Sequence, residues 1–444
     1  MSGLVANIDK ITDHIRKIKL IKQSGFVESV VGLVIEAGGP STRVGEHLLI
    51  ECPSSPGGVI MAEVVGFRNN KVLIMPLGEM EGISPGAKVW ASGYQLSVPV
   101  GDELLGRVVN GFIEPIDDKG PFLAHNRRPL NAEPPDPLKR RRISEPLYTG
   151  IRAIDCFTTC GKGQRMGIFS GSGVGKSTLL GMIARSSQAD VNVIGLIGER
   201  GREVLDFIEK DLGPEGLKRS VVIAVSSDKP PLVRVKAALA ATTLAEYFRD
   251  QGKDVVLMID SLTRIGMAQR EVGLATGEPP TTKGYTPSVF SFFPKLLERA
   301  GSCQSGSITG YYTVLVEGDD VNDPIADTTR AILDGHLWLS RSLASKNHFP
   351  AIDVLESISR LMIDVGPPAL LDIAGKGRRI LSDYRDAEDL INIGAYDKGS
   401  SSSIDLALEK IGPLNTFLRQ GINESSSFDD SMKSLLSIIS GEGA

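Results

Sequence analysis

The chain has 444 residues, of which 41% are hydrophobic and 23% charged, a balance that excludes an intrinsically disordered or fibrous protein. Its length exceeds what one hydrophobic core supports and predicts about three domains. The formal net charge of −5 gives no global reason to expect a nucleic-acid-binding protein.

Cysteine content and hydropathy indicate the cell compartment. The cysteines show no repeated C-x-x-C pairing, so the sequence predicts neither a disulfide framework nor a zinc site but reduced thiols, at Cys52, Cys156, Cys160 and Cys303. The longest apolar runs have the length of strands, and the N-terminus has no apolar signal-peptide core. We therefore expect a cytoplasmic protein.

Residues 1–24 are predicted to form a short amphipathic helix. Apolar side chains recur there at alternating spacings of four and three, at Leu4, Ile8, Ile11, Ile15 and Ile18. Such a helix either packs on its own domain or docks on a partner or an anionic membrane surface, and the periodicity leaves these alternatives open.

Residues 25–100 change to short β-rich runs separated by Gly, Pro, Asn and Ser, which predicts a small β-barrel or sandwich. Residues 101–150 are interpreted as a connecting segment, and the proline-rich part, Asn131–Pro146, as a linker. The basic run Lys139–Arg142 is expected to be solvated, and the alternative is contact with nucleic acid or a neighbouring subunit.

From residue 151 to 366, apolar strand-like runs alternate with helical runs, which predicts a parallel sheet covered on both faces. Residues 367–444 lack strand signals and carry amphipathic runs, so a helical C-terminal domain is expected. The predicted fold class is therefore an α/β core with a mainly parallel sheet, preceded by a β-barrel and followed by helices.

The stretch "SGSGVGKST", Ser170–Thr178, matches the phosphate-binding pattern G-x-x-x-x-G-K-[ST] except at its first position, where Ser170 replaces glycine. It follows the strand-like run "RMGIFS" and opens a helix, which places backbone N–H groups to hold oxyanions. Lys176 suits the β- and γ-phosphates of a nucleotide, and the Ser177 hydroxyl suits Mg²⁺. The candidate nucleotide-binding residues are Gly171, Ser172, Gly173, Val174, Gly175, Lys176, Ser177 and Thr178. The alternative is a glycine-rich turn.

Two carboxylates follow buried-type strands and are expected at the same sheet edge as this loop. Asp260 ends "DVVLMID" and is a candidate to hold the metal and its waters, whereas a helix cap is the alternative. Glu199 follows "VNVIGLIG" and is a candidate to polarise an attacking water. Its alternative is a surface salt bridge with Arg200 or Arg202. Lys176, Glu199 and the adjacent Arg200 are counted as catalytic candidates.

Six segments together resemble the rotary-type ATPase superfamily, which contains the F₁ catalytic subunits and the type III protein-export ATPases. They are "GSGVGKST", "GERGREV", "VLMIDSLTR", "PPTTKGYTPSVF", "LVEGDDVNDPIADTTRAILDGHLWLSR" and "HFPAIDVLESISR". The resemblance runs from about residue 25 to 420 and implies an N-terminal β-barrel, a RecA-like P-loop domain and a helical C-terminal domain. It also implies a hexameric ring with ATP sites between subunits.

Several details resemble the flagellar export branch of this superfamily. Gly201 stands where the F₁ β motif has threonine, and "YRDAEDLINIGAYDKGS" replaces the acidic D-E-L-S-E-E-D segment. Ser170 also fits that branch, whereas "PPTTKGYTPSVF" is closer to F- and V-type sequences. An injectisome secretion ATPase and a catalytic subunit of a rotary proton-translocating ATP synthase remain the alternatives.

The resemblance assigns further residues. Arg360 in "ESISR" matches an arginine finger that reaches the neighbouring subunit's γ-phosphate, and Phe349 matches the aromatic that stacks on adenine. Asp319, Asp320 and Asp323 match a loop that faces the pore of the ring, and exposed acidic turn residues are the alternative.

The function implied is Mg-ATP hydrolysis that releases chaperones and drives protein export. The implied cofactors are ATP and Mg²⁺. The implied partners are further copies of the chain in a homohexamer, a regulatory stalk protein at residues 1–24, a central stalk in the pore, the export gate, chaperones and export substrates. A peripheral position at the inner-membrane export apparatus follows, with no nucleic acid. A ring helicase of the transcription-termination type and a non-enzymatic nucleotide-binding assembly factor are the competing functions.

Overall fold

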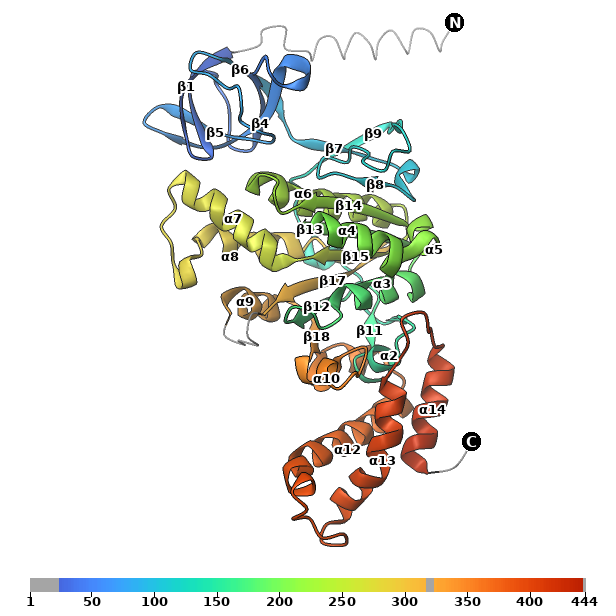
Figure 1. The fold of residues 1–444 in the computed structure, drawn as a ribbon. Helices are drawn as coiled ribbons and strands as arrows, with labels where there is room; N and C mark the ends of the chain where they lie inside the picture. Colours follow the sequence, from blue (N-terminus) through green and yellow to red (C-terminus); the bar gives the residue numbers. More distant parts are fainter. Residues whose placement is uncertain (1–23, 317–322, 442–444) are drawn as a thin grey trace, which may run out of the picture. The chain divides into compact units, whose positions relative to one another are not determined.

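The computed structural model describes residues 24–316 and 323–441, which fall into two compact units (Figure 1). One unit holds the chain up to Leu96 with Leu274–Glu278, and the other holds Ser97–Gly273 with the chain from Pro279 onward. The helix expected in residues 1–24 lies outside the described residues except for Ser24, and so do Asp319 and Asp320.

The first unit is a closed antiparallel barrel, which confirms the barrel expectation. Its strands are joined in the order β1-β2-β5-β4-β3-β6. Alternate side chains of each strand point inward, as in β3, where Leu48 and Ile50 are fully buried. The strands are β1 (Ser24–Val31), β2 (Val34–Gly38), β3 (Glu46–Glu51), β4 (Val59–Arg68), β5 (Lys71–Pro76) and β6 (Lys88–Gln95).

The second unit is built on a nine-stranded, mainly parallel sheet in the order β19-β18-β12-β17-β15-β13-β14-β8, with β16 paired to β17. Antiparallel pairing occurs at β18 with β19 and at β16 with β17. The strands are β8 (Val108–Val109), β12 (Arg165–Ser170), β13 (Val191–Glu199), β14 (Ser220–Ser226), β15 (Asp254–Asp260), β16 (Gly301–Ser302), β17 (Ser307–Leu315), β18 (Gly335–Leu339) and β19 (Ile352–Ser359). Two small ladders join β7 (Ser97–Val100) to β9 (Asn126–Pro129) and β10 (Pro146–Leu147) to β11 (Cys160–Gly161).

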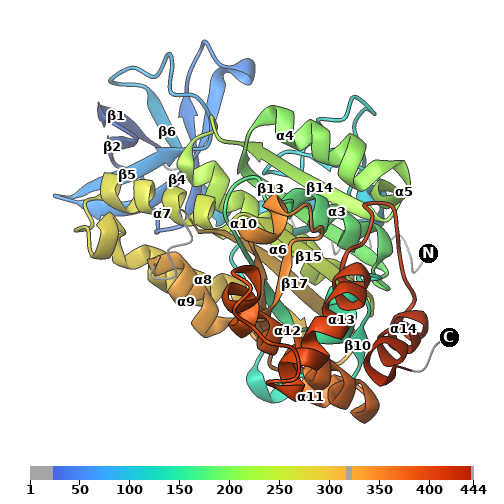
Figure 2. The ribbon, with the colours of Figure 1, turned by 60° about the horizontal axis from the view of Figure 1, so that its bottom comes forward.

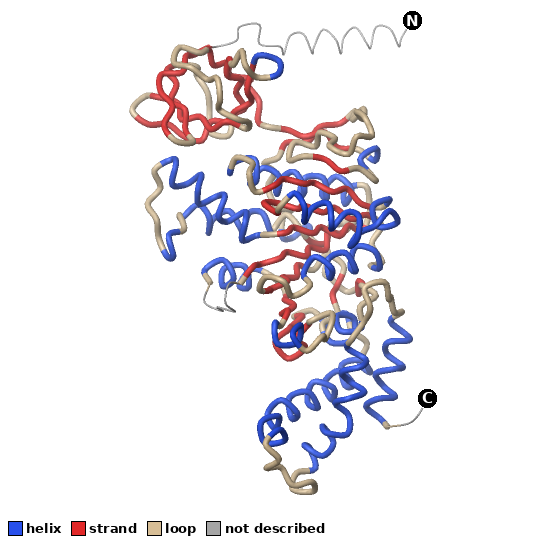
Figure 3. The backbone as a smooth tube through the Cα atoms, viewed as in Figure 1, coloured by secondary structure: helices blue, strands red, loops and turns tan. Residues whose placement is uncertain are grey.

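Helices cover this sheet, and strands and helices alternate along the central residues (Figure 3). All nine residues of β13 are buried, as expected for a strand covered on both faces. The helices are α2 (Arg152–Phe157), α3 (Lys176–Ser186), α4 (Gly201–Asp206), α5 (Gly213–Lys218), α6 (Pro231–Asp250), α7 (Leu262–Thr276), α8 (Pro287–Leu297), α9 (Pro324–Ile332), α10 (Arg341–Ser345), α11 (Met362–Val365), α12 (Pro368–Asn392), α13 (Ser402–Leu418) and α14 (Phe428–Ser440). Residues Phe207–Leu212 form a π-helix after α4.

The C-terminal helices α12, α13 and α14 pack together (Figure 2). They share one continuous hydrophobic core with the sheet, since Leu370, Phe417 and Leu435 belong to the same buried cluster as Ile168 of β12 and Ile194 of β13. The helical C-terminal region is therefore confirmed, but the structure groups it with the sheet in one compact unit.

The segment expected to be a connector is more structured than the sequence indicates. Within residues 97–129, β7 pairs with β9 outside the barrel, and β8 extends the edge of the main sheet beside β14. The expectation that the whole run Lys139–Arg142 is solvated is wrong. Arg140 is partly buried and donates hydrogen bonds to Ala300 O at 2.8 Å and to Glu298 O. The neighbouring Arg142 donates to Asp364 Oδ1 at 2.8 Å.

All four cysteines are free, and Cys52, Cys156 and Cys160 are buried. Among the described residues no helix combines the length and apolarity needed to cross a membrane.

Candidate nucleotide-binding and catalytic site

The loop Gly171–Gly175 connects the end of β12 to the start of α3, which begins at Lys176. Gly173 and Gly175 adopt left-handed conformations, with φ of +79° and +90°, which favour glycine at these positions. Ser170 instead lies within the strand and pairs with Leu315 of β17 and Leu339 of β18. Its backbone therefore has no need of glycine.

Lys176 lies between the two predicted carboxylates. Its Nζ donates to Asp260 Oδ1 at 2.5 Å and lies 3.6 Å from Glu199 Oε1. The carboxylates come together because β13 and β15 are parallel neighbours, with Leu196 opposite Asp260. Both strands end at the edge where the loop Gly171–Gly175 begins its helix, as the sequence predicted.

Glu199 is held in an unusual electrostatic state. The residue is 7% exposed, and burial raises the pKa of its carboxyl to about 7, with Lys176 lowering it and Asp260 raising it further. Its Oε1 is buried without a hydrogen-bond partner. A buried carboxylate oxygen that lacks a donor is rare in folded proteins and commonly marks a site where a bound group or water completes the bonding.

Phe349 lies beside the same loop. A Cβ placed on Gly175 would be 3.6 Å from Cδ1 of the Phe349 ring, and the phenyl group is still 39% exposed. The ring is therefore next to the phosphate loop with a face open to a ligand.

Matches with known proteins decide the family. Residues 150–359 match the nucleotide-binding domain of the ATP synthase alpha/beta family, and residues 27–93 match its beta-barrel domain. Residues 367–437 match the C-terminal domain of the T3SS EscN ATPase. The flagellum-specific ATP synthase of Bacillus subtilis (strain 168) is 53% identical, over 97% of this chain and 99% of the relative. The chain belongs to the family of flagellum-specific ATP synthases and type 3 secretion system ATPases.

Among the other relatives, some are named flagellum-specific ATP synthase and others type 3 secretion system ATPase. The type 3 secretion system ATPase of Xanthomonas euvesicatoria is 49% identical, with 94% of each chain covered. The structure of the assembled ATPase EscN from enteropathogenic E. coli superposes with a TM-score of 0.89 at 45% identity, covering 94% of this chain and all of that one. The resemblance in the sequence is thereby confirmed, and the chain is an ATP-hydrolysing enzyme of the type III export class.

Two predicted arginines of this export ATPase make no hydrogen bond or ion pair with Glu199 or Asp260 within the described residues of one chain. The side chain of Arg200 is 78% exposed and pairs with Glu203 at 3.4 Å. Arg360 follows β19 on the surface, where its backbone N–H donates to Asp334 O at 3.0 Å. The described residues provide no hydrogen bond or ion pair for the Arg360 guanidinium, so its predicted role stays a prediction about a neighbouring copy.

Asp323 has a local structural role. Its Oδ1 accepts hydrogen bonds from the backbone N–H groups of Ile325 and Ala326 at 2.9 and 3.0 Å, and so caps the N-terminus of α9. Its predicted position facing a pore is not tested by a single chain.

Two residues of the site escaped the sequence-based prediction. Thr313 Oγ1 on β17 donates to Asp260 Oδ1 at 2.7 Å and fixes that carboxylate together with Lys176. Arg264, in the first turn of α7, lies 4.0 Å from Glu199 Oε2. The "SLTR" after Asp260 carried a signal for Arg264, because a helix that starts at the sheet edge keeps its first turn there, whereas a threonine inside a strand carries none.

The donor set fits Mg²⁺ bound together with ATP. Magnesium prefers oxygen ligands and is usually held by one or two protein groups plus phosphates and water. The Ser177 hydroxyl, in the first turn of α3, and the Asp260 carboxylate are such groups. Lys176 Nζ contacts both Asp260 Oδ1 and Glu199 Oε1, so the two carboxylates lie on either side of the same ammonium group. Among the described residues no cluster of three or more His, Cys, Asp or Glu is placed to hold a metal.

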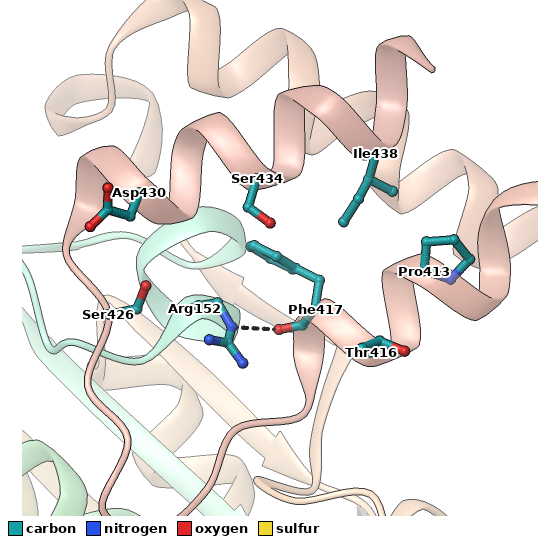
Figure 4. A pocket seen from close by; sticks show the side chains of 8 residues that line it. All are labelled: Arg152, Pro413, Thr416, Phe417, Ser426, Asp430, Ser434 and Ile438. Atoms are coloured by element: carbon teal, nitrogen blue, oxygen red, sulfur yellow. Dashed lines mark hydrogen bonds between the residues drawn. The ribbon is translucent and has the colours of Figure 1, made fainter. Parts of the chain in front are cut away.

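A cavity of about 630 Å³ lies elsewhere, between α2, α13 and α14 (Figure 4). Its arginine, Arg152, is already bonded: it donates to Phe417 O at 2.7 Å and to Arg419 O at 2.5 Å, and pairs with Glu424. The cavity is thus a gap between helices, where Arg152 joins the start of α2 to the end of α13 and the residues after it, and no predicted nucleotide-binding residue lines it.

Proposed function

We propose that this ATPase hydrolyses Mg-ATP in a homohexameric ring and powers the export of flagellar proteins, releasing them from their chaperones. The flagellar assignment is supported by relatives named flagellum-specific ATP synthase at 53% and 51% identity, compared with 49% for the first type 3 secretion system relative. The position of the chain would be peripheral, on the cytoplasmic side of the inner-membrane export apparatus.

One observation carries the proposed chemistry: Glu199 Oε1 is buried without a hydrogen-bond partner, 3.6 Å from Lys176 Nζ. The backbone N–H groups of Gly171–Gly175 and the Lys176 ammonium would hold the phosphates. The Ser177 hydroxyl and Asp260 would hold the metal, and Phe349 would stack on the base. Mg²⁺ supplies neutralisation of phosphate charge. Glu199 accepts a proton from the water that attacks the γ-phosphorus, and ADP leaves.

Arg360 is proposed to act on the site of the neighbouring subunit, where a cation stabilises the charge that develops on the transferred phosphoryl group. Its exposed and unpaired guanidinium supports this role. Arg200 is proposed as a second cation that turns toward the phosphates when nucleotide binds.

The proposed partners follow from the relatives. EscN is solved as an assembled ATPase and in complex with its central stalk EscO. We propose the same arrangement here, with a stalk protein near Asp319, Asp320 and Asp323, a regulatory stalk at residues 1–24, and contacts with the export gate, chaperones and substrates.

The test of the chemistry is Glu199→Gln. This variant keeps the shape of the side chain but cannot accept a proton, so it should bind ATP and hydrolyse it very slowly. Turnover at the wild-type rate would contradict the role of Glu199 and favour a non-enzymatic assembly factor.

Docking of the regulatory stalk at the N-terminus is tested by a pulldown with this stalk protein, using the chain with and without residues 1–20. Equal binding by both forms would contradict docking at the N-terminus.

The second candidate function is that of an injectisome secretion ATPase, which the Xanthomonas euvesicatoria relative supports. The gene neighbourhood separates the two: flagellar structural genes favour the first proposal, injectisome genes the second, and ATP synthase genes would contradict both.

A further inference from the structure

A small cavity lies where the C-terminal helices meet the sheet, lined from α10, β19, α12, α13 and the residues next to them. Its volume is about 150 Å³, which is enough space for a benzene-sized molecule. Much of its wall is apolar, from Leu343, Ile352, Val354, Leu381, Ile411 and Leu418. No residue of the proposed ATP chemistry lines it.

Four polar side chains in the wall lack a hydrogen-bond or ion-pair partner among the described residues: the buried His348, the half-buried Tyr384 and Asn415, and the exposed Arg419. His348 is the most informative, because it is 4% exposed and its Nε2 is buried without a partner. Leaving such a group unsatisfied costs free energy of folding, so an unpartnered buried imidazole calls for a bonding group that binds there.

The charged side chains that line the cavity indicate whether the group that binds there is positive or negative. Asp353 accepts two hydrogen bonds of 2.7 Å from Arg385, and Glu388 pairs with Lys346 at 3.1 Å. Both carboxylates are therefore neutralised within the wall, and Arg419 is the charged lining residue left without a counterion among the described residues.

Each of the four unpartnered groups is able to donate a hydrogen bond, and the unpaired charge is positive. Arg419 lies one helical turn after Asn415, whose carbonyl accepts the Arg419 backbone N–H at 3.1 Å, so the two share one face of the chain. A small ligand that carries a negatively charged hydrogen-bond acceptor on an apolar body would therefore match both the unpartnered donors and the apolar side chains of the wall.

We propose that this cavity binds a small organic carboxylate, with its charge at Arg419 and its carbon body against the apolar walls. The cavity is too small for a nucleotide or a peptide, and its unpaired donors do not suit a cation.

Two backbone connections join this site to the phosphate loop. His348 immediately precedes Phe349, whose ring packs against Gly175, and Gln420, next to Arg419, donates its backbone N–H to Phe349 O at 2.9 Å. A ligand that fixes His348 and Arg419 therefore fixes the position of Phe349. This regulatory step rests on the proposed function, because it takes Phe349 as the side chain that stacks on adenine.

The site is tested by titrating the full chain with benzoate, followed by ligand-observed NMR. Arg419→Gln should weaken benzoate binding by about tenfold or more, because a charge-assisted hydrogen bond is lost. Asn415→Leu should weaken it less. The matched control is Arg379→Gln, which removes another exposed arginine, on α12 outside the cavity, and should leave benzoate affinity unchanged.

Equal benzoate affinity in Arg419→Gln and the wild type would overturn the site, and so would equal binding of the uncharged benzamide. Benzoate binding that disappears in Lys176→Ala would also overturn it, because the ligand would then sit on the phosphate loop. Retained binding in that variant supports the site whether or not the proposed ATP chemistry is right.

The regulatory step has its own readout. Saturating benzoate should change the dissociation constant of Mg-ATP in Glu199→Gln, and by linkage Mg-ATP should change that of benzoate by the same factor. Benzoate that binds at Arg419 and leaves the Mg-ATP constant unchanged would overturn the regulatory step.

Discussion

Ser170 stands where the phosphate-loop pattern has glycine, and its surroundings predict that this substitution has little effect on catalysis. The residue is 1% exposed, its backbone is part of β12, and its Oγ has no hydrogen-bond partner. Ser170→Gly should therefore change kcat and KM for ATP by less than about twofold. The substitution should instead lower the free energy of unfolding, since glycine in a strand interior destabilises a protein by about 0.5–1 kcal/mol relative to alanine. A large loss of turnover measured by phosphate release would show that the hydroxyl takes part in the reaction.

The raised pKa of Glu199 predicts the pH dependence of hydrolysis. Burial brings the pKa of this carboxyl to about 7, so below that pH the free enzyme holds a protonated Glu199 that cannot accept a proton from water. The value of kcat/KM should rise with pH and level off above about 8, because this parameter reports the free enzyme. Ser170→Gly should keep this rising limb, and Glu199→Gln should lose it. A limb that persists in Glu199→Gln would assign the titration to another group.

What the sequence predicts at residue scale depends on local pattern. Lys176, Glu199 and Asp260 were found because each ends a strand or opens a helix, and parallel strands bring those ends to one edge. Thr313 and Arg140 were missed because their roles depend on partners far along the chain, Asp260 and Glu298. The structure brings Lys176, Glu199 and Asp260 together, and their chemical roles remain predictions, as do those of Arg200, Phe349 and Arg360, which concern a bound nucleotide or a second subunit.

At the scale of elements, the packing of α3 predicts the effect of adding a single methyl group. Gly181 on α3 lies against the π-helix Phe207–Leu212, and a Cβ there would be 2.5 Å from Asp211 O and 2.7 Å from Asp211 Cβ. Gly181→Ala should therefore push α3 from its neighbour and destabilise the protein by about 1–3 kcal/mol.

The control for this prediction is Gly375→Ala on α12, where a Cβ meets no atom within 4 Å. In that open helical position alanine should stabilise by about 0.5–1 kcal/mol. The melting temperatures of both variants, measured by thermal unfolding, test this prediction. A Gly181→Ala melting temperature equal to or above that of the wild type would contradict it, because α3 and the π-helix would then accommodate the methyl group without loss of stability.

The elements themselves were predicted to the extent that their hydrophobic period was clear. Barrel strands such as β3 alternate buried and half-buried residues, and β13 is buried along its whole length and mostly apolar. Both patterns are recognisable in the sequence as those of strands. In contrast β8 has two residues, Val108 and Val109, and joins the sheet through pairing with Val222 and Ile223. A strand of two residues is too short to show a hydrophobic pattern, and its position is set by its pairing with β14, which the sequence does not indicate.

At the scale of the whole molecule, one chain brings Lys176, Glu199 and Asp260 together, whereas the Arg360 guanidinium has no hydrogen bond or ion pair among the described residues. Lys176 is bonded to Asp260, and Arg360 stands exposed on a different part of the surface. In the proposed mechanism the transition state gathers negative charge, and Arg360 of a neighbouring chain would stabilise it in addition to Arg200 of the same chain. A head-to-tail ring supplies one to every site, because each interface joins two different surfaces.

This arrangement predicts complementation between two inactive variants. Arg360→Ala keeps its own site but offers no cation to its neighbour, and should lose about 10³-fold in kcat in an assembled ring. Lys176→Ala loses its own site but keeps Arg360. In rings assembled from an equal mixture, about a quarter of interfaces pair an intact site with an intact Arg360, so turnover should recover to at most about a quarter of wild type. Arg379→Gln mixed with Lys176→Ala controls for assembly, because its own sites and fingers are both intact. A mixture no more active than either parent, or an Arg360→Ala ring that hydrolyses ATP normally, would rule out a shared site and require the cation to come from within the chain.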